Sequence, residues 1–232
     1  LFSAMASAGP GTFFMPYTEA GLVALHPEVE YYRAEWEKRP MKTLFLHEKP
    51  YIAYIPVPTF HDFAMDVFDR MLKSGGVDFI YLDDVQYCGT PSINLAAGTG
   101  YCRDDGQVQG GASLFALREY VRRIAHLFHE NRMTPAVVVH MTNFAVAPVL
   151  SFAAFQLDWE WKYDSRADYQ DRFPPDLIRV ESTGLQSGCV PWVLRVNSAV
   201  DAKEQARLNR TFDAVLLAHD ITWWGRPLPV LE

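Results

Sequence analysis

Two adjacent carboxylic acids, Asp83 and Asp84, are the residues of this sequence best placed to do chemistry. They follow an apolar and aromatic run, residues 77–82, that begins after the glycine pair Gly75 and Gly76. Such a run predicts a buried strand of a parallel sheet covered by helices. Acidic residues at the carboxyl end of such a strand lie where α/β folds place their active sites. The structural alternative is that one of them caps the next element or accepts a backbone N–H.

Paired carboxyl groups suit the cleavage of a glycosidic bond. This reaction needs one protonated carboxyl group for the leaving oxygen, together with a carboxylate or an internal nucleophile on the anomeric side. Adjacent carboxylates repel each other, so their pKa values separate. We therefore expect Asp84 to act as the general acid and Asp83 as the orienting base.

A second acidic strand end follows the apolar run that begins at Phe152. Asp158 and Glu160 are two residues apart, so they share one face of an extended strand and Trp159 takes the other. We expect Glu160 to bind substrate or to be an alternative catalytic carboxylate. An ion pair with an arginine such as Arg195 is its structural alternative.

Polar and aromatic side chains near other strand ends complete a candidate carbohydrate site. Tyr17, Thr18 and Glu19 lie near the carboxyl end of one short expected strand. A glycine-rich loop, residues 86–112, follows the acidic pair and is well placed to cover the site. Exposed tyrosine and tryptophan rings stack on apolar faces of ligands, including sugar rings. The expected substrate-binding residues are Tyr17, Tyr87, Tyr101, His140, Asn143, Asp158, Trp159, Trp192, His219 and Asp220.

Strand and helix patterns alternate along the chain. Expected strands lie at residues 12–18, 77–82, 135–141, 152–160 and 190–196, with at least one more at 43–47 or 51–57. Expected helices lie at 27–38, from Thr59 to Gly75 with Asp62 completing a capping box, from Ser113, and from Asp201 to about His219. This order predicts a parallel α/β fold, a TIM-type (β/α)8 barrel. An open doubly wound sheet is the alternative, but the glycine-rich phosphate motifs typical of that fold are absent from the sequence.

The expected domain organisation is one catalytic-type barrel domain, residues 1–232. The chain starts at Leu1 in the middle of the pattern, so we expect a truncated barrel that lacks its first unit and belongs to a longer protein. With 21 basic and 28 acidic residues, the formal net charge is −7, and no basic stripe occurs. Nucleic acid and membranes are therefore not expected partners, and neither is a cofactor. The cellular location stays open, and a secreted or periplasmic protein is compatible with the sequence.

Cysteines and histidines leave further alternatives. Cys88 and Cys102 bracket the long loop and could form a disulfide or remain thiols, whereas we expect Cys189 to be buried. The pairs His61-Asp62 and His219-Asp220 could meet His140 in a metal-dependent hydrolase of the amidohydrolase type. None of the seven histidines shows H-x-H or H-E-x-x-H spacing, so we expect no metal site. A carbohydrate-binding barrel without catalysis is the other alternative.

A series of short motifs, in order over residues 13–224, resembles bacterial glycoside-hydrolase-like proteins related to family 123. The motifs are Pro16-Tyr17, His26-Pro27-Glu28, Glu35-Trp36, residues 76–83, Cys88, Gly100-Tyr101-Cys102, Arg118, His140, Asp158-Trp159-Glu160, Asp168-Tyr169 and Leu217-Ala218-His219-Asp220. The resemblance implies a (β/α)8 barrel that hydrolyses N-acetylated amino sugars, with the acetamido oxygen of the substrate as nucleophile. It also implies an aspartate that orients the acetamido group and a glutamate that is the acid. Here Asp84 stands in the position of that glutamate.

Overall fold

The computed structural model describes residues 13–39, 43–46, 48–85, 92–94, 98–140, 146–160, 174–181, 188–194 and 201–224. The chain divides into two compact units, Leu1–Val138 and Val139–Glu232. The boundary falls inside strand β8 (Val137–His140). The expectation of one barrel domain over residues 1–232 stays a prediction.

A parallel strand pair organises the first unit. Strands β1 (Tyr17–Glu19) and β5 (Ile80–Asp83) run parallel, with Tyr17 opposite Tyr81 and Glu19 opposite Asp83. Ile80 and Leu82 are fully buried, as expected for an apolar strand covered on both sides. The strand is shorter at its start than the apolar run of the sequence, because Asp78 binds the loop before β1 there: its carboxylate accepts the Phe14 N–H at 2.8 Å.

An antiparallel sheet of three strands accompanies this pair, in the order β2 (Leu22–Ala24), β4 (Lys49–Ala53) and β3 (Leu44–Leu46). Both expected ranges, 43–47 and 51–57, contain a strand, and β4 begins two residues before the second range because it includes Lys49 and Pro50. Pro50 lacks an N–H, but its carbonyl accepts a hydrogen bond from the Leu25 N–H at 2.9 Å. The expected helix near residues 27–38 is present as α2 (Pro27–Trp36).

The two amphipathic helices predicted from apolar stripes are α3 (Pro58–Lys73) and α4 (Leu114–Glu130), and they pack on each other. The Tyr120 ring of α4 lies 6.0 Å from the Phe60 ring and 6.4 Å from the Phe68 ring, centroid to centroid. The predicted capping box at Thr59 is wrong, because α3 begins after Val57 with a proline at its first turn. The Thr59 hydroxyl instead donates to the Glu35 carboxylate at 2.7 Å.

The end of α3 is predicted correctly, since Gly75 takes the left-handed conformation (φ +75°) that stops a helix. Ser113 is the N-cap residue of α4, although its side chain makes no capping hydrogen bond.

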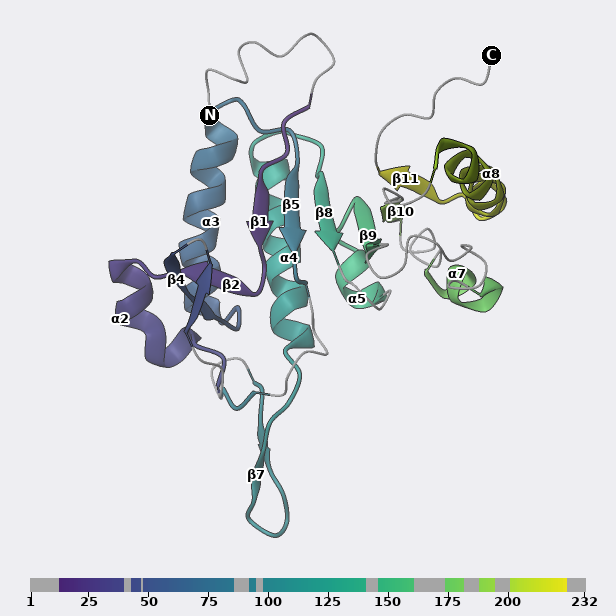
Figure 1. Ribbon diagram of the computed structural model, residues 1–232. Coiled ribbons are helices and arrows are strands. Elements are labelled where there is room, and N and C mark those ends of the chain that lie inside the picture. The colour runs from purple at the N-terminus through teal and green to yellow at the C-terminus, as the bar shows by residue number, and fades with distance from the viewer. Residues whose placement is uncertain are drawn as a thin grey trace. The chain divides into compact units, whose positions relative to one another are not determined.

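The expected loop 86–112 contains a hairpin that the sequence did not predict, formed by β6 (Tyr101–Cys102) and β7 (Val108–Gln109). At its base, Asn94 and Thr99 pair through backbone bonds of 2.8 and 3.0 Å, and both residues are buried. Figure 1 shows the hairpin standing away from the rest of the first unit, at the end to which β1 and β5 point.

The second unit holds three parallel strands, β9 (Phe155–Glu160), β10 (Val190–Leu194) and β11 (Thr222–Trp224). Helix α8 (Ala202–Ala218) begins at Asp201 as predicted, and the Asp201 carboxylate accepts the N–H groups of Lys203 and Glu204 at 3.0 and 2.9 Å. Helices α5 (Ala147–Leu150) and α7 (Pro175–Glu181) were not predicted. The core of the unit consists of Ile178, Val193, Leu208, Phe212, Leu216 and Ile221.

The predicted parallel α/β class is confirmed, because β1 and β5 in one unit and β9, β10 and β11 in the other pair in parallel. Closure into an eight-stranded barrel stays a prediction. None of the helices in the described ranges combines the length and apolarity needed to cross a bilayer.

Candidate active site at the carboxyl ends of strands β1 and β5

Two aromatic and two acidic side chains share one face of the parallel pair in the first unit. Because side chains alternate along a strand, Tyr17 and Glu19 of β1 lie on the same face as Tyr81 and Asp83, the residues paired with them on β5. The rings of Tyr17 and Tyr81 stack with centroids 5.3 Å apart. The two carboxyl groups therefore follow the ring pair toward the carboxyl ends of the strands.

The Tyr17 hydroxyl contacts both carboxyl groups. It lies 2.9 Å from Glu19 Oε1 and also forms a hydrogen bond with Asp83 Oδ2. Burial of the phenol oxygen and its contacts with Asp83 and then Glu19 raise the pKa of Tyr17 well above its usual value. The hydroxyl therefore remains protonated at physiological pH, where it is a hydrogen-bond donor and not a base.

Asp84 follows the strand in a different conformation. Its backbone is left-handed (φ +53°), a region that aspartate and asparagine adopt more readily than most residues. Its N–H donates to Asp83 Oδ1 at 2.8 Å. The negative charge of Asp84 acts on the half-buried ammonium group of Lys38, whose pKa is nevertheless lowered because burial dominates.

Hydrogen bonds from buried and half-buried groups fix the two strand ends. The Ala20 N–H donates to the Asp83 carbonyl at 2.7 Å, which continues the β1–β5 pairing past Glu19. The Tyr54 hydroxyl donates to the Glu19 carbonyl at 3.3 Å. Tyr54 itself is buried and stacks on Phe60 of α3 at 3.8 Å between centroids. The backbone that carries the carboxyl groups is thus tied to the core of the first unit.

Of the residues predicted for the site, the structure brings together Tyr17, Asp83 and Asp84, and it adds Glu19. The sequence placed Glu19 near a strand end but gave no reason to prefer it. Its importance follows from the pairing of β1 with β5, which are far apart in the chain. Tyr101 lies on the hairpin and is 59% exposed, and its predicted role in binding stays a prediction.

The other predicted residues with described side chains belong to the second unit. His140 is the last residue of β8 and is buried. The Trp192 ring lies 4.2 Å from that of Phe155 on the neighbouring strand. His219 is the C-cap of α8, and Asp220 follows it in a left-handed conformation (φ +54°). Their roles in substrate binding stay predictions.

The pattern of β9 differs from the simple alternation assumed from the sequence. The register with β10 shifts so that Leu157 pairs with Trp192 and Trp159 with Val193, and Asp158 is the extra residue. A bulge of this kind interrupts the period of two, on which the shared face of Asp158 and Glu160 depends. The side chains of residues 158–160, and the whole of Tyr87 and Asn143, lie outside the described part of the chain.

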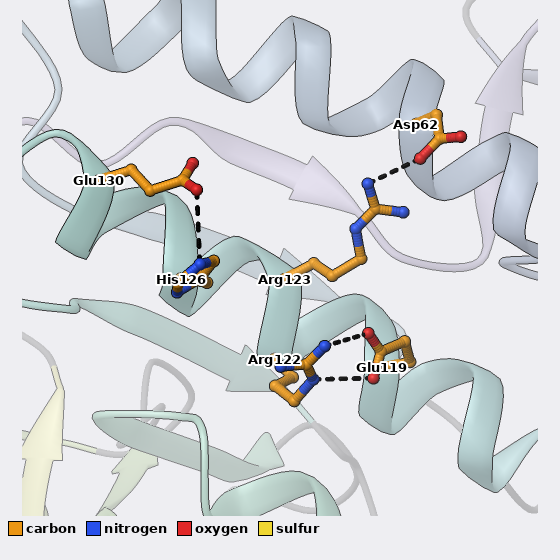
Figure 2. Close-up of polar contacts among 6 residues, drawn as sticks. All are labelled: Asp62, Glu119, Arg122, Arg123, His126 and Glu130. Carbon is orange, nitrogen blue, oxygen red and sulfur yellow. Dashed lines mark hydrogen bonds and ion pairs between the residues drawn. The ribbon is translucent and has the colours of Figure 1, made fainter.

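The two residues of the first unit in the metal alternative have other contacts. His61 is buried in α3 and stacks on Tyr120 at 5.6 Å between ring centroids. Asp62 forms an ion pair of 2.7 Å with Arg123 of α4, as Figure 2 shows. Within the described ranges, no group of three or more histidine, cysteine or acidic side chains is arranged to hold a metal ion.

Two of the three cysteines are described. Cys189 is fully buried, as predicted, and burial raises the pKa of its thiol to about 12. Cys102 is exposed and carries a free thiol, the second of the two alternatives left open by the sequence. Cys88 lies outside the described residues.

Comparisons with known proteins give a likeness of fold. No family model matches the sequence, and no curated protein matches it, so the resemblance to family 123 stays a prediction. Among solved structures, an α-galactosidase from Thermus thermophilus bound to p-nitrophenyl α-D-galactopyranoside matches with a TM-score of 0.50 and 13% identity over 94% of this chain and 44% of that chain. The glycoside hydrolase domain of PelA from Pseudomonas aeruginosa matches with a TM-score of 0.52 and 11% identity over 92% of this chain and 77% of that chain. The chain thus spans less than half of the first protein and about three quarters of the second, and it shares the fold of these glycoside hydrolases.

Proposed function

We propose that this chain is a glycoside hydrolase whose catalytic carboxylates are Asp83 and Asp84, with Glu160 as a substrate-binding or further catalytic carboxylate. The observation that carries the proposal is the pair of carboxyl groups, Glu19 and Asp83, held at one tyrosine hydroxyl at the ends of two parallel strands. This is the edge of a parallel sheet at which α/β enzymes carry out their chemistry. The shared fold with an α-galactosidase and with the PelA hydrolase domain supports the same reading.

In the first unit, carboxyl groups would transfer protons during the reaction, and Tyr17 would position these carboxyl groups. One carboxyl group of the cluster protonates the glycosidic oxygen, which makes the sugar leaving group neutral. An ionised carboxylate orients the attacking group on the anomeric side. Tyr17 keeps its proton, so it positions the carboxyl groups and can donate to a sugar hydroxyl. The exposed Tyr17 ring offers a flat face for a sugar ring.

The resemblance to family 123 suggests the substrate class, N-acetylated amino sugars, with the acetamido group as internal nucleophile. In that case Asp83 or Asp84 orients the acetamido nitrogen. Asp84 has a shorter side chain than the glutamate found in the family, so the acid must reach the leaving oxygen from a different place. The structure offers Glu19, a longer acidic side chain, next to Asp83.

A screen of the purified chain against glycosides tests the proposal. Aryl glycosides with and without the N-acetyl group, and their natural counterparts, should separate the substrate classes. We expect turnover of at least one class and a loss of about 10²–10⁴-fold in Asp83→Asn, the range for losing a positioned acid or base. Asp66→Asn is the matched control, because Asp66 is an exposed residue of α3 that pairs with Arg70 at 2.7 Å.

Two other results would redirect the proposal. Sugar binding in calorimetry without turnover of any glycoside would indicate a carbohydrate-binding barrel without catalysis. Activity that depends on an added divalent metal would indicate the amidohydrolase-type alternative. The proposal as a whole would be contradicted if the chain hydrolysed none of the glycosides and bound none of the sugars.

A further inference from the structure

The number of protons at the Tyr17 hydroxyl does not match the number of its acceptors. A phenol carries one proton, and an ionised carboxylate has none to give. The Tyr17 oxygen nevertheless lies within hydrogen-bond distance of Glu19 Oε1 and of Asp83 Oδ2. Tyr17 can give one strong hydrogen bond, to one of them. The second contact becomes a full hydrogen bond when that carboxyl group is protonated and donates to the phenol oxygen.

The charges around the hydroxyl favour such a bound proton. The charged groups that act on the hydroxyl are Glu19 of β1 and Asp83 of β5. Tyr81 of β5 lies near both of these carboxyl groups, and Tyr54 after β4 lies near Glu19. Asp84, the residue after β5, acts on Tyr81 and on Lys38 after α2. With Glu19, Asp83 and Asp84 all ionised, three negative charges would lie close together at the ends of β1 and β5. Mutual repulsion between close carboxylates raises the affinity of one of them for a proton. The neighbouring tyrosines keep their hydroxyl protons, because burial and the carboxylates raise their pKa values.

Asp84 differs from the other two carboxyl groups. Lys38 lies close enough for its charge to interact with that of Asp84, and this interaction favours the ionised carboxylate. Asp84 also lies beyond the strand, beside Gly21: an added Cβ there would lie 3.6 Å from the Asp84 Cβ. The contacts that favour a shared proton are those of Glu19 and Asp83 with Tyr17.

We infer that Glu19 and Asp83 hold one proton between them through the Tyr17 hydroxyl at neutral pH, and that this pair, and not Asp84, is the general acid. The second half of the inference rests on the proposed function; the first half does not. During hydrolysis the pair gives its proton to the glycosidic oxygen while the bond to the anomeric carbon breaks and its electrons pass to that oxygen. The oxygen of water then bonds to the anomeric carbon, and the proton that this water releases restores the pair. The acid role first expected for Asp84 thereby passes to the pair of Glu19 and Asp83.

The protonation can be measured without a substrate. Side-chain carboxyl groups of the ¹³C-labelled chain are followed by NMR as a function of pH. In the unmodified chain we expect one carboxyl group to remain protonated at neutral pH. Glu19→Gln and Asp83→Asn should each abolish that signal, since the remaining carboxylate accepts the Tyr17 proton, whereas Asp84→Asn and the control Asp66→Asn should keep it. Melting curves of the variants verify folding.

Different results would contradict the shared proton and the proposed glycoside hydrolase function. If every carboxyl group of the unmodified chain were ionised at neutral pH, the shared proton would be excluded, whether or not any variant folds. A signal that survives in both Glu19→Gln and Asp83→Asn would exclude this pair as its source. If the signal behaves as expected but no glycoside is hydrolysed, the proton pair stands and the proposed function fails. If glycosides are hydrolysed and only Asp84→Asn loses the acid-dependent step, the pair is not the acid.

Discussion

Glu19 lies opposite Asp83 in the parallel register of β1 and β5, and the Tyr17 hydroxyl contacts both carboxyl groups. This relationship joins two segments that are far apart in the sequence. It places Glu19, which sequence patterns do not single out, next to Asp83, which they do. The catalytic proposal and the predictions about it depend on this pairing.

A buried histidine between α3 and α4 should make the stability of the chain sensitive to acid. His61 is 3% exposed, and burial first, then the charge of Arg123, lower its pKa. The unfolded chain therefore binds more protons than the folded chain once the pH falls below about 6.5, the usual value for histidine. The free energy of unfolding should decrease as the pH falls, by at most about 1.4 kcal/mol per pH unit for this one group. Chemical denaturation at several pH values measures the slope.

The matched variants for this test are His61→Gln and His126→Gln. His126 lies on the exposed side of α4 and pairs with Glu130 at 3.4 Å, as Figure 2 shows. His61→Gln should flatten the acid slope, whatever its effect on overall stability, and His126→Gln should leave it nearly unchanged. An unaltered slope in His61→Gln would mean that other groups cause the acid sensitivity.

The ion pair between Asp62 of α3 and Arg123 of α4 should add a small, salt-dependent coupling between the helices. Its atoms are 2.7 Å apart, and the side chains are 72% and 31% exposed. Exposed pairs typically contribute about 0.2–1 kcal/mol, and salt screens them. A double-mutant cycle of Asp62→Asn and Arg123→Gln should give a coupling energy in that range at low salt and less in high salt.

Glu119 and Arg122 provide the comparison, because they pair at 2.6 Å within α4 and do not join two helices. Coupling between Asp62 and Arg122, which pairs with Glu119 instead, should be close to zero in a second double-mutant cycle. If the Asp62–Arg123 coupling were absent at low salt, the contact would have no energetic role in solution.

The two described thiols should differ sharply in reactivity. Cys102 is exposed, whereas Cys189 is fully buried and its pKa is about 12. Thiolates are the reactive form, so iodoacetamide at mildly alkaline pH should label Cys102 and leave Cys189 unmodified. Peptide mass spectrometry before and after denaturation measures the difference. Rapid labelling of Cys189 in the native chain would show that the second unit opens readily.

The parallel class, the strand after Gly75-Gly76 and the main helices could be predicted, because apolar periodicity and glycine stops are local signals. Phe60, Ala64 and Phe68 define the buried face of α3 in the sequence as they do in the structure. The start of α3 was missed because the helix begins with Pro58 in its first turn, and Thr59 is therefore inside the helix and not its N-cap. The three-stranded antiparallel sheet was missed because Pro50 argues against a strand. In the structure Pro50 lies opposite Phe45 of β3, and its carbonyl accepts the Leu25 N–H.

The candidate site could be predicted in part. Asp83, Asp84 and Tyr17 follow from strand-end positions. Glu19 and Lys38 could not be predicted as site residues, because their positions depend on which strands are neighbours and on where α2 ends. The bulge at Asp158 could not be predicted either, since a register shift between β9 and β10 is a property of the strand pair and not of either strand alone.

The most direct test of catalysis by these carboxyl groups is the activity of Asp83→Asn on two glycosides of the same sugar, one natural and one with a nitrophenyl leaving group. Protonation matters most for the poor leaving group, so kcat/KM for the natural glycoside should fall by about 10²–10⁴-fold and that for the nitrophenyl glycoside by clearly less. Asp66→Asn should match the unmodified chain on both. Undiminished activity of Asp83→Asn on both substrates, or an equal loss on both, would contradict the assignment of Asp83 to the acid.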